Sequence, residues 1–213
     1  MLKRVYVWEF PVRLTHWLNF LSILALSVTG FYVGAPFIHA IRENQFIMAQ
    51  MRFIHFVSAY VFAACFFIRI YWLFAGNRYA RWDQFLPLTS ERRKNLTATA
   101  AFYCYIKGEC PPVTGHTGLA GITYLLLFIL FLLEVLTGFA LYAESHGGGL
   151  WTLLGGWLLW VLSTGTIRLI HHGIMWLIIP FVIIHVYISW HNDRIERCGL
   201  ISSIFSGYKT LEH

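Results

Sequence analysis

The sequence contains few charged residues: aspartate, glutamate, lysine and arginine together make up 12% of its 213 residues. Hydrophobic residues make up 58%, which exceeds the roughly half that is usual in soluble domains. This composition argues against an ordinary water-soluble domain of this length. We therefore expect an integral membrane protein in contact with lipid.

Cysteine is also scarce, with four residues, and none stands in a Cys-x-x-Cys-His motif. This argues against covalently attached c-type haem. No disulfide is expected, because Cys104, Cys110 and Cys198 fall on the side of the membrane that we predict to be reducing. The sequence shows no Ser-His-Asp arrangement, His-Glu-x-x-His motif or glycine-rich phosphate loop, so we assign no catalytic residues.

Four long apolar segments are present, and each is long enough to cross a hydrocarbon core that needs about 20 helical residues. A shorter apolar stretch at residues 150–162 follows three glycines and predicts a short helix on the outer membrane surface. We expect all other residues to form connections, and the first span to be retained rather than cleaved as a signal. The predicted fold is an all-α bundle of four transmembrane helices forming one domain over residues 1–213, with helices at about 14–33, 53–74, 119–142 and 169–190.

The net charge of +6 is distributed according to membrane topology and does not indicate nucleic-acid binding. Only three basic residues flank the spans on one side: Arg42, Arg52 and Arg168. Twelve lie on the other side: Lys3, Arg4, Arg13, Arg78, Arg81, Arg92, Arg93, Lys94, Lys107, Arg194, Arg197 and Lys209. By the positive-inside rule, both termini and the long middle connection lie in the cytoplasm.

Four histidines lie within or at the ends of the spans, where polar residues are costly and usually functional. His171 and His185 are 14 residues apart, which is roughly 21 Å along a helix, and they point within about 40° of the same direction. This spacing predicts two haems stacked across the bilayer. We pair His16 with His185 on an inner haem and His55 with His171 on an outer haem. The adjacent His172 is the alternative to His171.

The step of 14 residues recurs in the first two spans. It leads from His16 to Gly30, which leaves room for the edge of the outer haem or serves helix packing. It leads from His55 to Arg69, which pairs with a haem propionate or extends to the membrane interface. A weaker repeat places Thr-Gly-Phe near the outer ends of the first and third spans, in VTGFY and LTGFALY, and suggests related packing.

Two axial histidines close both free positions on a haem iron, which suits it to electron transfer. An inner haem would pass electrons to a lipid-soluble quinone, whose reduction also consumes protons. Glu134, within the third span, is either a proton relay or a paired structural carboxylate. The candidate quinone-site residues are His116, Arg78, Tyr79, Asn192 and Asp193. The alternative interpretations are a loop histidine for His116 and membrane-interface anchors for Arg78 and Asp193.

Four segments carry a family resemblance: VYVWEFPVRLTHWLNFLSILALSVTGF, IHFVSAYVFAACFFIRIYWLFAGNRYAR, LTGFALYAE and WLIIPFVIIHVY. They resemble the b-type cytochrome subunit of membrane-bound nickel–iron uptake hydrogenases, in a wider group with the formate dehydrogenase gamma subunit. The resemblance implies two b-type haems on the same four histidines. Around His171 the sequence departs from the family pattern at Leu169 and Gly173.

The resemblance also implies a place in a respiratory chain in the bacterial inner membrane. The iron–sulfur small subunit of a hydrogenase on the outer face, bound to its large subunit, would reduce the outer haem. The chain would then be an electron-transfer subunit delivering electrons to menaquinone or ubiquinone, not the catalytic hydrogenase itself.

Histidines within membrane spans also occur in proteins with three other functions. A formate dehydrogenase subunit would share the ligands and differ in partner. A free-standing di-haem oxidoreductase would need a charged funnel on the outer face, where only three arginines are available. A zinc or copper transporter would need its ligands around one ion, which two layers roughly 21 Å apart do not provide.

Overall fold

The computed structural model describes residues 2–37, 46–109, 115–196 and 199–212. Four of its helices are long and apolar enough to cross a membrane, which confirms the four predicted spans. They are α1 (Phe10–Gly34), α2 (Ile47–Ala75), α4 (Gly118–Ser145) and α6 (Thr164–Glu196). Each continues past its predicted apolar limits, because backbone hydrogen bonding extends a helix beyond the hydrocarbon core. Cys110, Cys198, Arg42 and Arg197 lie outside the described residues.

The chain divides into two compact units. One is Leu14–Ile70, which contains most of α1 and α2. The other combines Met1–Arg13 with Tyr71–His213 and contains α4, α6 and the shorter elements. The single-domain organisation stays a prediction.

In the smaller unit, α1 buries small polar residues at a step of seven: Thr15, Ser22 and Thr29. Seven residues are about two helical turns, so these side chains share one face. Small residues on such a face allow close approach of membrane helices, where apolar burial gives no driving force against lipid. A hydrogen bond from α2 to Thr29 shows that α1 and α2 meet at this face.

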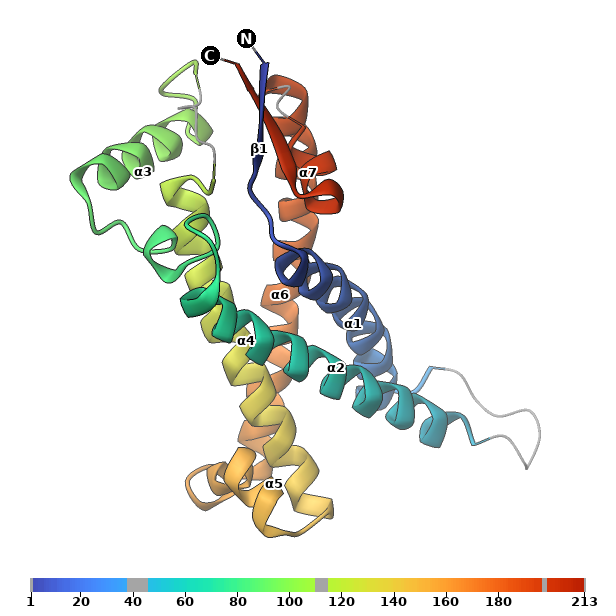
Figure 1. Ribbon diagram of the computed structural model, residues 1–213. Helices are drawn as coiled ribbons and strands as arrows, with labels where there is room; N and C mark the ends of the chain where they lie inside the picture. Colours follow the sequence, from blue (N-terminus) through green and yellow to red (C-terminus); the bar gives the residue numbers. More distant parts are fainter. Residues whose placement is uncertain (1, 38–45, 110–114, 197–198, 213) are drawn as a thin grey trace. The chain divides into compact units, whose positions relative to one another are not determined.

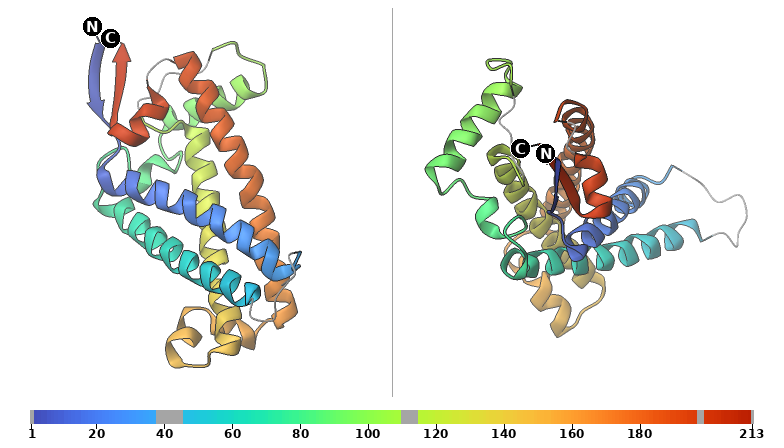
Figure 2. Two further views of the ribbon diagram at one scale, coloured as in Figure 1. Left: turned by 90° about the vertical axis from the view of Figure 1, so that its right-hand side faces the viewer. Right: turned by 45° about the horizontal axis from the view of Figure 1, so that its top comes forward.

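In the larger unit, α4 and α6 run side by side in opposite directions (Figures 1 and 2). Buried isoleucines at positions 167, 174 and 178 form one face of α6, and Phe131 and Val135 are buried on α4. Thr117 begins α4, because its side chain accepts a hydrogen bond from the backbone N–H of Ala120 at 3.1 Å.

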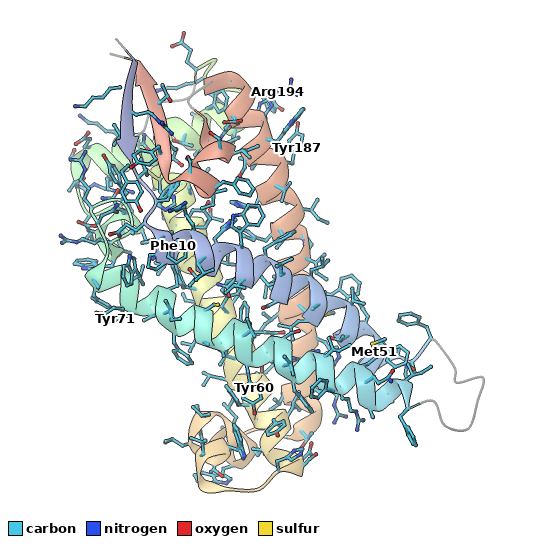
Figure 3. All side chains as sticks on the ribbon, turned by 45° about the vertical axis from the view of Figure 1, so that its right-hand side comes forward. Phe10, Met51, Tyr60, Tyr71, Tyr187 and Arg194 are labelled. Carbon is cyan, nitrogen blue, oxygen red and sulfur yellow. The ribbon has the colours of Figure 1, made fainter. Side chains whose placement is uncertain are left out.

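The far end of α6 carries aromatic rings and a cation together. Tyr187 is 60% exposed, and the guanidinium of Arg194 lies 5.2 Å from the centre of the Trp190 ring. Figure 3 shows Tyr187 and Arg194 projecting outward from the same end of the helix. Aromatic and basic residues are typical of the boundary between hydrocarbon and water, and this end of α6 has that composition.

The two ends of the chain pair with each other, which the sequence did not predict. Strand β1 (Leu2–Tyr6) lies antiparallel to β2 (Tyr208–Glu212), with Tyr6 opposite Tyr208. Both termini therefore lie together, as an even number of spans requires (Figure 1). The expectation that residues outside the spans form only connections is wrong, because a strand of five residues depends on a partner far along the chain.

Further short elements occupy other predicted connections. They are η1 (Trp82–Gln84), α3 (Ser90–Tyr103) and α7 (Leu200–Ser206). Helix α3 is polar and begins at a local signal, since the Thr89 side chain accepts a hydrogen bond from the backbone N–H of Arg92. An apolar-run search overlooks such a helix.

The predicted surface helix at 150–162 is two elements, α5 (Gly149–Leu154) and η2 (Gly156–Trp160). They are separated at Gly155, which lies against the backbone of α4. A Cβ atom on Gly155 would come within 2.3 Å of the Leu136 carbonyl oxygen, so only glycine permits this approach. Trp160 is 79% exposed, as expected for an interfacial segment.

Candidate functional site

His55 is held by a threonine from the neighbouring helix. Its Nδ1 lies 2.9 Å from Oγ1 of Thr29, and the same hydroxyl lies 2.7 Å from the carbonyl oxygen of Ala25. A hydroxyl has one proton, and the short distance to the carbonyl indicates that the proton is donated there. The hydroxyl oxygen then accepts the Nδ1–H of His55, so the ring carries its lone pair on Nε2, the nitrogen that commonly binds a metal.

His171 has the same arrangement in the other unit. Its Nδ1 lies 3.0 Å from Oγ1 of Thr137, and that hydroxyl lies 2.7 Å from the carbonyl oxygen of Leu133. His171 is therefore also held as an Nδ1–H donor, with its lone pair on Nε2. The two histidines predicted for the outer haem have matching hydrogen bonds.

The surroundings of His171 distinguish it from its neighbour. An oxygen of Glu134 lies 3.5 Å from its Nδ1, and a Cβ atom on Gly138 would lie 3.4 Å from its Cε1. His172 instead directs Nδ1 to the carbonyl of Arg168 on its own helix, at 2.8 Å. This bond would also leave the lone pair of His172 on Nε2, so hydrogen bonding alone does not choose between the two, and the direction that His171 shares with His185 remains the reason to prefer it. The contact with Glu134 is in line with the paired-carboxylate interpretation of that residue.

The histidines predicted for the inner haem lie in aromatic surroundings. The imidazole of His185 stacks on Phe181, with centroids 5.8 Å apart and planes at 11°, and is edge-on to Tyr124 at 6.0 Å. His16 lies edge-on to Trp17 at 5.3 Å.

The four predicted ligands are shared between the two compact units. His171 and His185 lie on one continuous helix, α6, as their spacing required. His16 and His55 lie in the smaller unit. Each predicted pair thus takes one histidine from each unit, and both pairings stay predictions.

Gly30 and Arg69, the other residues predicted to face a haem, also belong to the smaller unit. Both are half-buried, on α1 and α2 respectively. Their roles toward a haem stay predictions.

His116, the first quinone-site candidate, lies in a group of aromatic rings. Its imidazole is 4.8 Å from the ring centre of Trp8, 5.5 Å from that of Phe85 and 5.0 Å from that of Tyr124. Tyr124 also contacts the ring of His185. A continuous series of ring contacts therefore leads from His116 through Tyr124 to the predicted inner ligand.

Arg78 and Tyr79 lie beside this group. The guanidinium of Arg78 donates to the Tyr79 hydroxyl and lies 4.7 Å from the centre of its ring. The ring of Tyr79 is buried in a cluster with Val7, Trp8, Val12 and Ala80. A Cβ atom on Gly115 would lie 3.2 Å from Tyr79 Cδ1, so Tyr79 lies next to the residue preceding His116.

The remaining two candidates make structural contacts. Asn192 donates from Nδ2 to the hydroxyl of Tyr103 at 2.9 Å and joins α6 to α3. Asp193 accepts a hydrogen bond from the backbone N–H of Ile201 at 3.2 Å and stabilises the first turn of α7. The structure brings His116, Arg78 and Tyr79 into one region and gives Asn192 and Asp193 other partners.

Sequence reasoning did not identify Thr29, Thr137 or Tyr124 as site residues. Thr29 and Thr137 are the threonines of the Thr-Gly-Phe repeat, but the repeat by itself indicates only related helix packing. Tyr124 is one aromatic residue within an apolar span, and no local pattern distinguishes it from residues that face lipid.

Comparisons with known proteins agree along nearly the whole chain. The family described as prokaryotic cytochrome b561 matches residues 7–207. The probable Ni/Fe-hydrogenase B-type cytochrome subunit of Rhodobacter capsulatus is 38% identical, over 98% of this chain and 82% of the relative. That of Cupriavidus necator is 38% identical over 99% and 89%. The probable Ni/Fe-hydrogenase 1 B-type cytochrome subunit of Escherichia coli K12 is 31% identical over 96% and 90%.

Proposed function

The chain belongs to the prokaryotic cytochrome b561 family, and on this premise we propose that it is the subunit through which a nickel–iron hydrogenase passes electrons to a quinone. Family membership makes it a cytochrome b, with b-type haem as its cofactor. It also confirms the resemblance seen in the sequence. The hydrogenase partner is inferred from the relatives, and its iron–sulfur small subunit, bound to the large subunit, is the expected electron donor.

The observation that carries this proposal is the hydrogen bonding of His55 and His171. In each imidazole Nδ1 meets a threonine hydroxyl oxygen, so the proton lies on Nδ1 and the lone pair on Nε2. Nε2 is the nitrogen through which histidine commonly binds haem iron, and the orienting bond at the other nitrogen is typical of metal-bound histidine. The residues present therefore fit a haem held by two axial imidazoles.

A bound haem b supplies reversible one-electron chemistry at its iron. The chain's own residues bind, orient and insulate it. We assign His55 and His171 to an outer haem and His16 and His185 to an inner haem. Gly30 leaves space at the outer level, and the apolar spans exclude water from both sites.

Arg69 is assigned to a propionate of the inner haem. Propionates are anionic, and a guanidinium pairs with a carboxylate through two parallel hydrogen bonds. Its half-buried position on α2 suits a cation that is shielded by such a partner.

The quinone is proposed to bind near His116. Reduction of one quinone to quinol consumes two electrons and two protons. Oxidation of one H₂ on the periplasmic face would supply the two electrons and release its protons there, and the two protons for the quinone would come from the side on which it binds. His116 is outside the four spans and can hold or release a proton at an imidazole nitrogen. Its contact with Tyr124, and that of Tyr124 with His185, bring this group close to the inner ligand.

Arg78 and Tyr79 complete the proposed quinone site. The contact of Arg78 with Tyr79, and of Tyr79 with Gly115, gathers polar hydrogen-bonding groups beside the aromatic rings. Asn192 and Asp193 remain peripheral candidates because their side chains already bond to Tyr103 and to α7.

The orientation proposed is that of a bacterial inner-membrane protein with both termini in the cytoplasm. The support is the excess of basic residues in the terminal segments and the middle connection, together with the pairing of β1 and β2. The hydrogenase would then lie on the periplasmic face, and electrons would move inward to menaquinone or ubiquinone.

The first experiment is a haem-to-protein ratio with a reduced-minus-oxidised spectrum of the purified chain. Two haems per chain with a low-spin b-type spectrum are expected. A purified chain with one haem, or none after mild extraction, would contradict the two-layer assignment.

A second experiment identifies the partner. Membranes containing this chain and its hydrogenase should reduce both haems under H₂, and membranes lacking the hydrogenase should not. Reduction by formate in place of H₂ would instead favour a formate dehydrogenase partner.

A further inference from the structure

Two Thr-Gly-Phe sequences occupy equivalent places on two different helices. Thr29 on α1 contacts a histidine of α2, and Thr137 on α4 contacts a histidine of α6. The distances from hydroxyl oxygen to Nδ1 are 2.9 and 3.0 Å. The repeat that was visible in the sequence therefore marks the same contact made twice.

The direction of each hydrogen bond follows from the backbone. Both hydroxyls lie 2.7 Å from the carbonyl four residues earlier, that of Ala25 for Thr29 and that of Leu133 for Thr137. Because the single hydroxyl proton is committed to this carbonyl, the oxygen presents a lone pair to the imidazole. The threonine thus selects the tautomer with its proton on Nδ1.

The glycine that follows Thr137 contributes to the same contact. A Cβ atom on Gly138 would lie only 3.4 Å from Cε1 of His171, so glycine keeps this edge of the imidazole clear. The imidazole can then lie close enough to α4 for Nδ1 to reach the hydroxyl. Threonine provides the acceptor, and glycine provides the space.

We infer that Thr29 and Thr137 are positioning residues for the two axial histidines of one haem, the outer one. This rests on the proposed function, which assigns His55 and His171 to that haem. Each threonine fixes the proton on Nδ1, so that Nε2 would be the nitrogen that holds the iron, and its acceptance of the Nδ1–H bond would make the imidazole a stronger electron donor to that iron. A ligand that donates more electron density favours ferric over ferrous iron, so the threonines lower the midpoint potential of the outer haem.

The test rests first on Thr29, because Glu134 lies 3.5 Å from His171 Nδ1 and is an alternative acceptor when Thr137 is replaced. Thr29→Val removes the hydroxyl and keeps the shape, whereas Thr29→Ser keeps the hydroxyl. Thr123→Val is the matched control, since Thr123 makes the same bond to a carbonyl four residues earlier on α4, that of Leu119. The readouts are the midpoint potentials of both haems and the electron paramagnetic resonance signals of the ferric forms.

The expected result is that Thr29→Val raises the potential of one haem and leaves the other unchanged. A tenfold loss of preference for ferric iron corresponds to about 59 mV for a one-electron couple. The resonance of the same haem should shift, and Thr29→Ser and Thr123→Val should match the unaltered protein. Thr137→Val should act on the same haem as Thr29→Val, with a larger shift when combined with Glu134→Leu, which removes the alternative acceptor.

Two results would overturn the inference while leaving the proposed function intact. The first is that Thr29→Val and Thr123→Val give the same haem potentials, while the unaltered protein holds two bis-histidine haems. The other is a shift in Thr29→Ser equal to that in Thr29→Val, which would indicate packing rather than hydrogen bonding. An unaltered protein without haem would instead reject the proposed function. If Thr29→Val lost both haems, the same comparison would be made with Thr137→Val/Glu134→Leu against Thr137→Ser/Glu134→Leu.

Discussion

One carboxylate oxygen of Glu9 accepts a hydrogen bond from the indole Nε1 of Trp72 at 2.9 Å. The same oxygen accepts the backbone N–H of Asn77 at 2.8 Å, and the Asn77 side chain donates to the carbonyl of Val7 at 3.0 Å. The residue before α1 is thereby joined to the end of α2 and to the turn that follows it. Glu9 stabilises the fold on the side where the termini meet.

Glu9→Ala should destabilise the protein by about 3 kcal/mol, because two donors lose a charged acceptor. The apparent melting temperature, followed by loss of the haem spectrum or by aggregation, should fall by roughly 5–10 °C. The melting temperature should fall less in Glu9→Gln, since an amide oxygen can accept both hydrogen bonds. Glu91→Ala, at an exposed position in the first turn of α3, is the matched control. Equal melting temperatures for Glu9→Ala and Glu91→Ala would contradict this role.

Gly155→Ala should displace α5 and η2 from α4, because the added Cβ would lie 2.3 Å from the Leu136 carbonyl oxygen. The cost expected for such overpacking is about 1–3 kcal/mol. The displacement should appear as faster proteolysis within residues 147–163. Gly149→Ala is the control, since a Cβ there meets nothing within 4 Å. Similar proteolysis of both variants would argue against close packing at Gly155.

The adjacent histidines on α6 offer a paired test of the outer ligand. His171→Leu should remove the outer haem and block entry of electrons from the hydrogenase, whereas His172→Leu should retain two haems, because His171 points within about 40° of the direction of His185 and His172 points about 140° away from it. Haem content and the spectrum under H₂ measure both effects. A protein that loses a haem with His172→Leu and keeps it with His171→Leu would reverse the assignment.

Replacement of an inner ligand should separate haem reduction from quinone reduction. In His185→Leu the outer haem should still be reduced by H₂, and quinol formation should stop. Stopped-flow spectra of the haems and quinol production on the same membranes give the two readouts. Two fully reducible haems in this variant would mean that His185 is not a ligand.

His116→Phe tests the proposed quinone site while keeping an aromatic ring in the cluster. Both haems should bind and be reduced by H₂ at normal rates, and quinol formation should slow on the order of 100-fold, because proton transfer at the imidazole is lost. Asn192→Leu, which removes the bond to Tyr103, should affect stability more than quinol formation. Unchanged quinol formation in His116→Phe would place the quinone elsewhere.

Much of the fold could be predicted because a membrane span is a local property. A run of about 20 apolar residues is sufficient to identify a transmembrane helix, whatever it packs against. The helix positions and the resemblance to a hydrogenase cytochrome followed from such local evidence. Helix α3 was not predicted because it is polar. The predicted helical segment after the third span is present, but the sequence alone does not show its division at Gly155, because that break depends on contact with α4.

The sequence by itself determined the class of protein, the four spans and the position of His171 and His185 on one helix, since these depend on hydrophobicity and helical spacing. Only the tertiary structure decided which residues meet across helices. The contacts of Thr29 with His55 and of Tyr124 with His185, and the pairing of β1 with β2, join residues that are distant in the chain. Hydrogen bonds and ring contacts act over a few ångströms, so they exist only once the fold has brought their partners together.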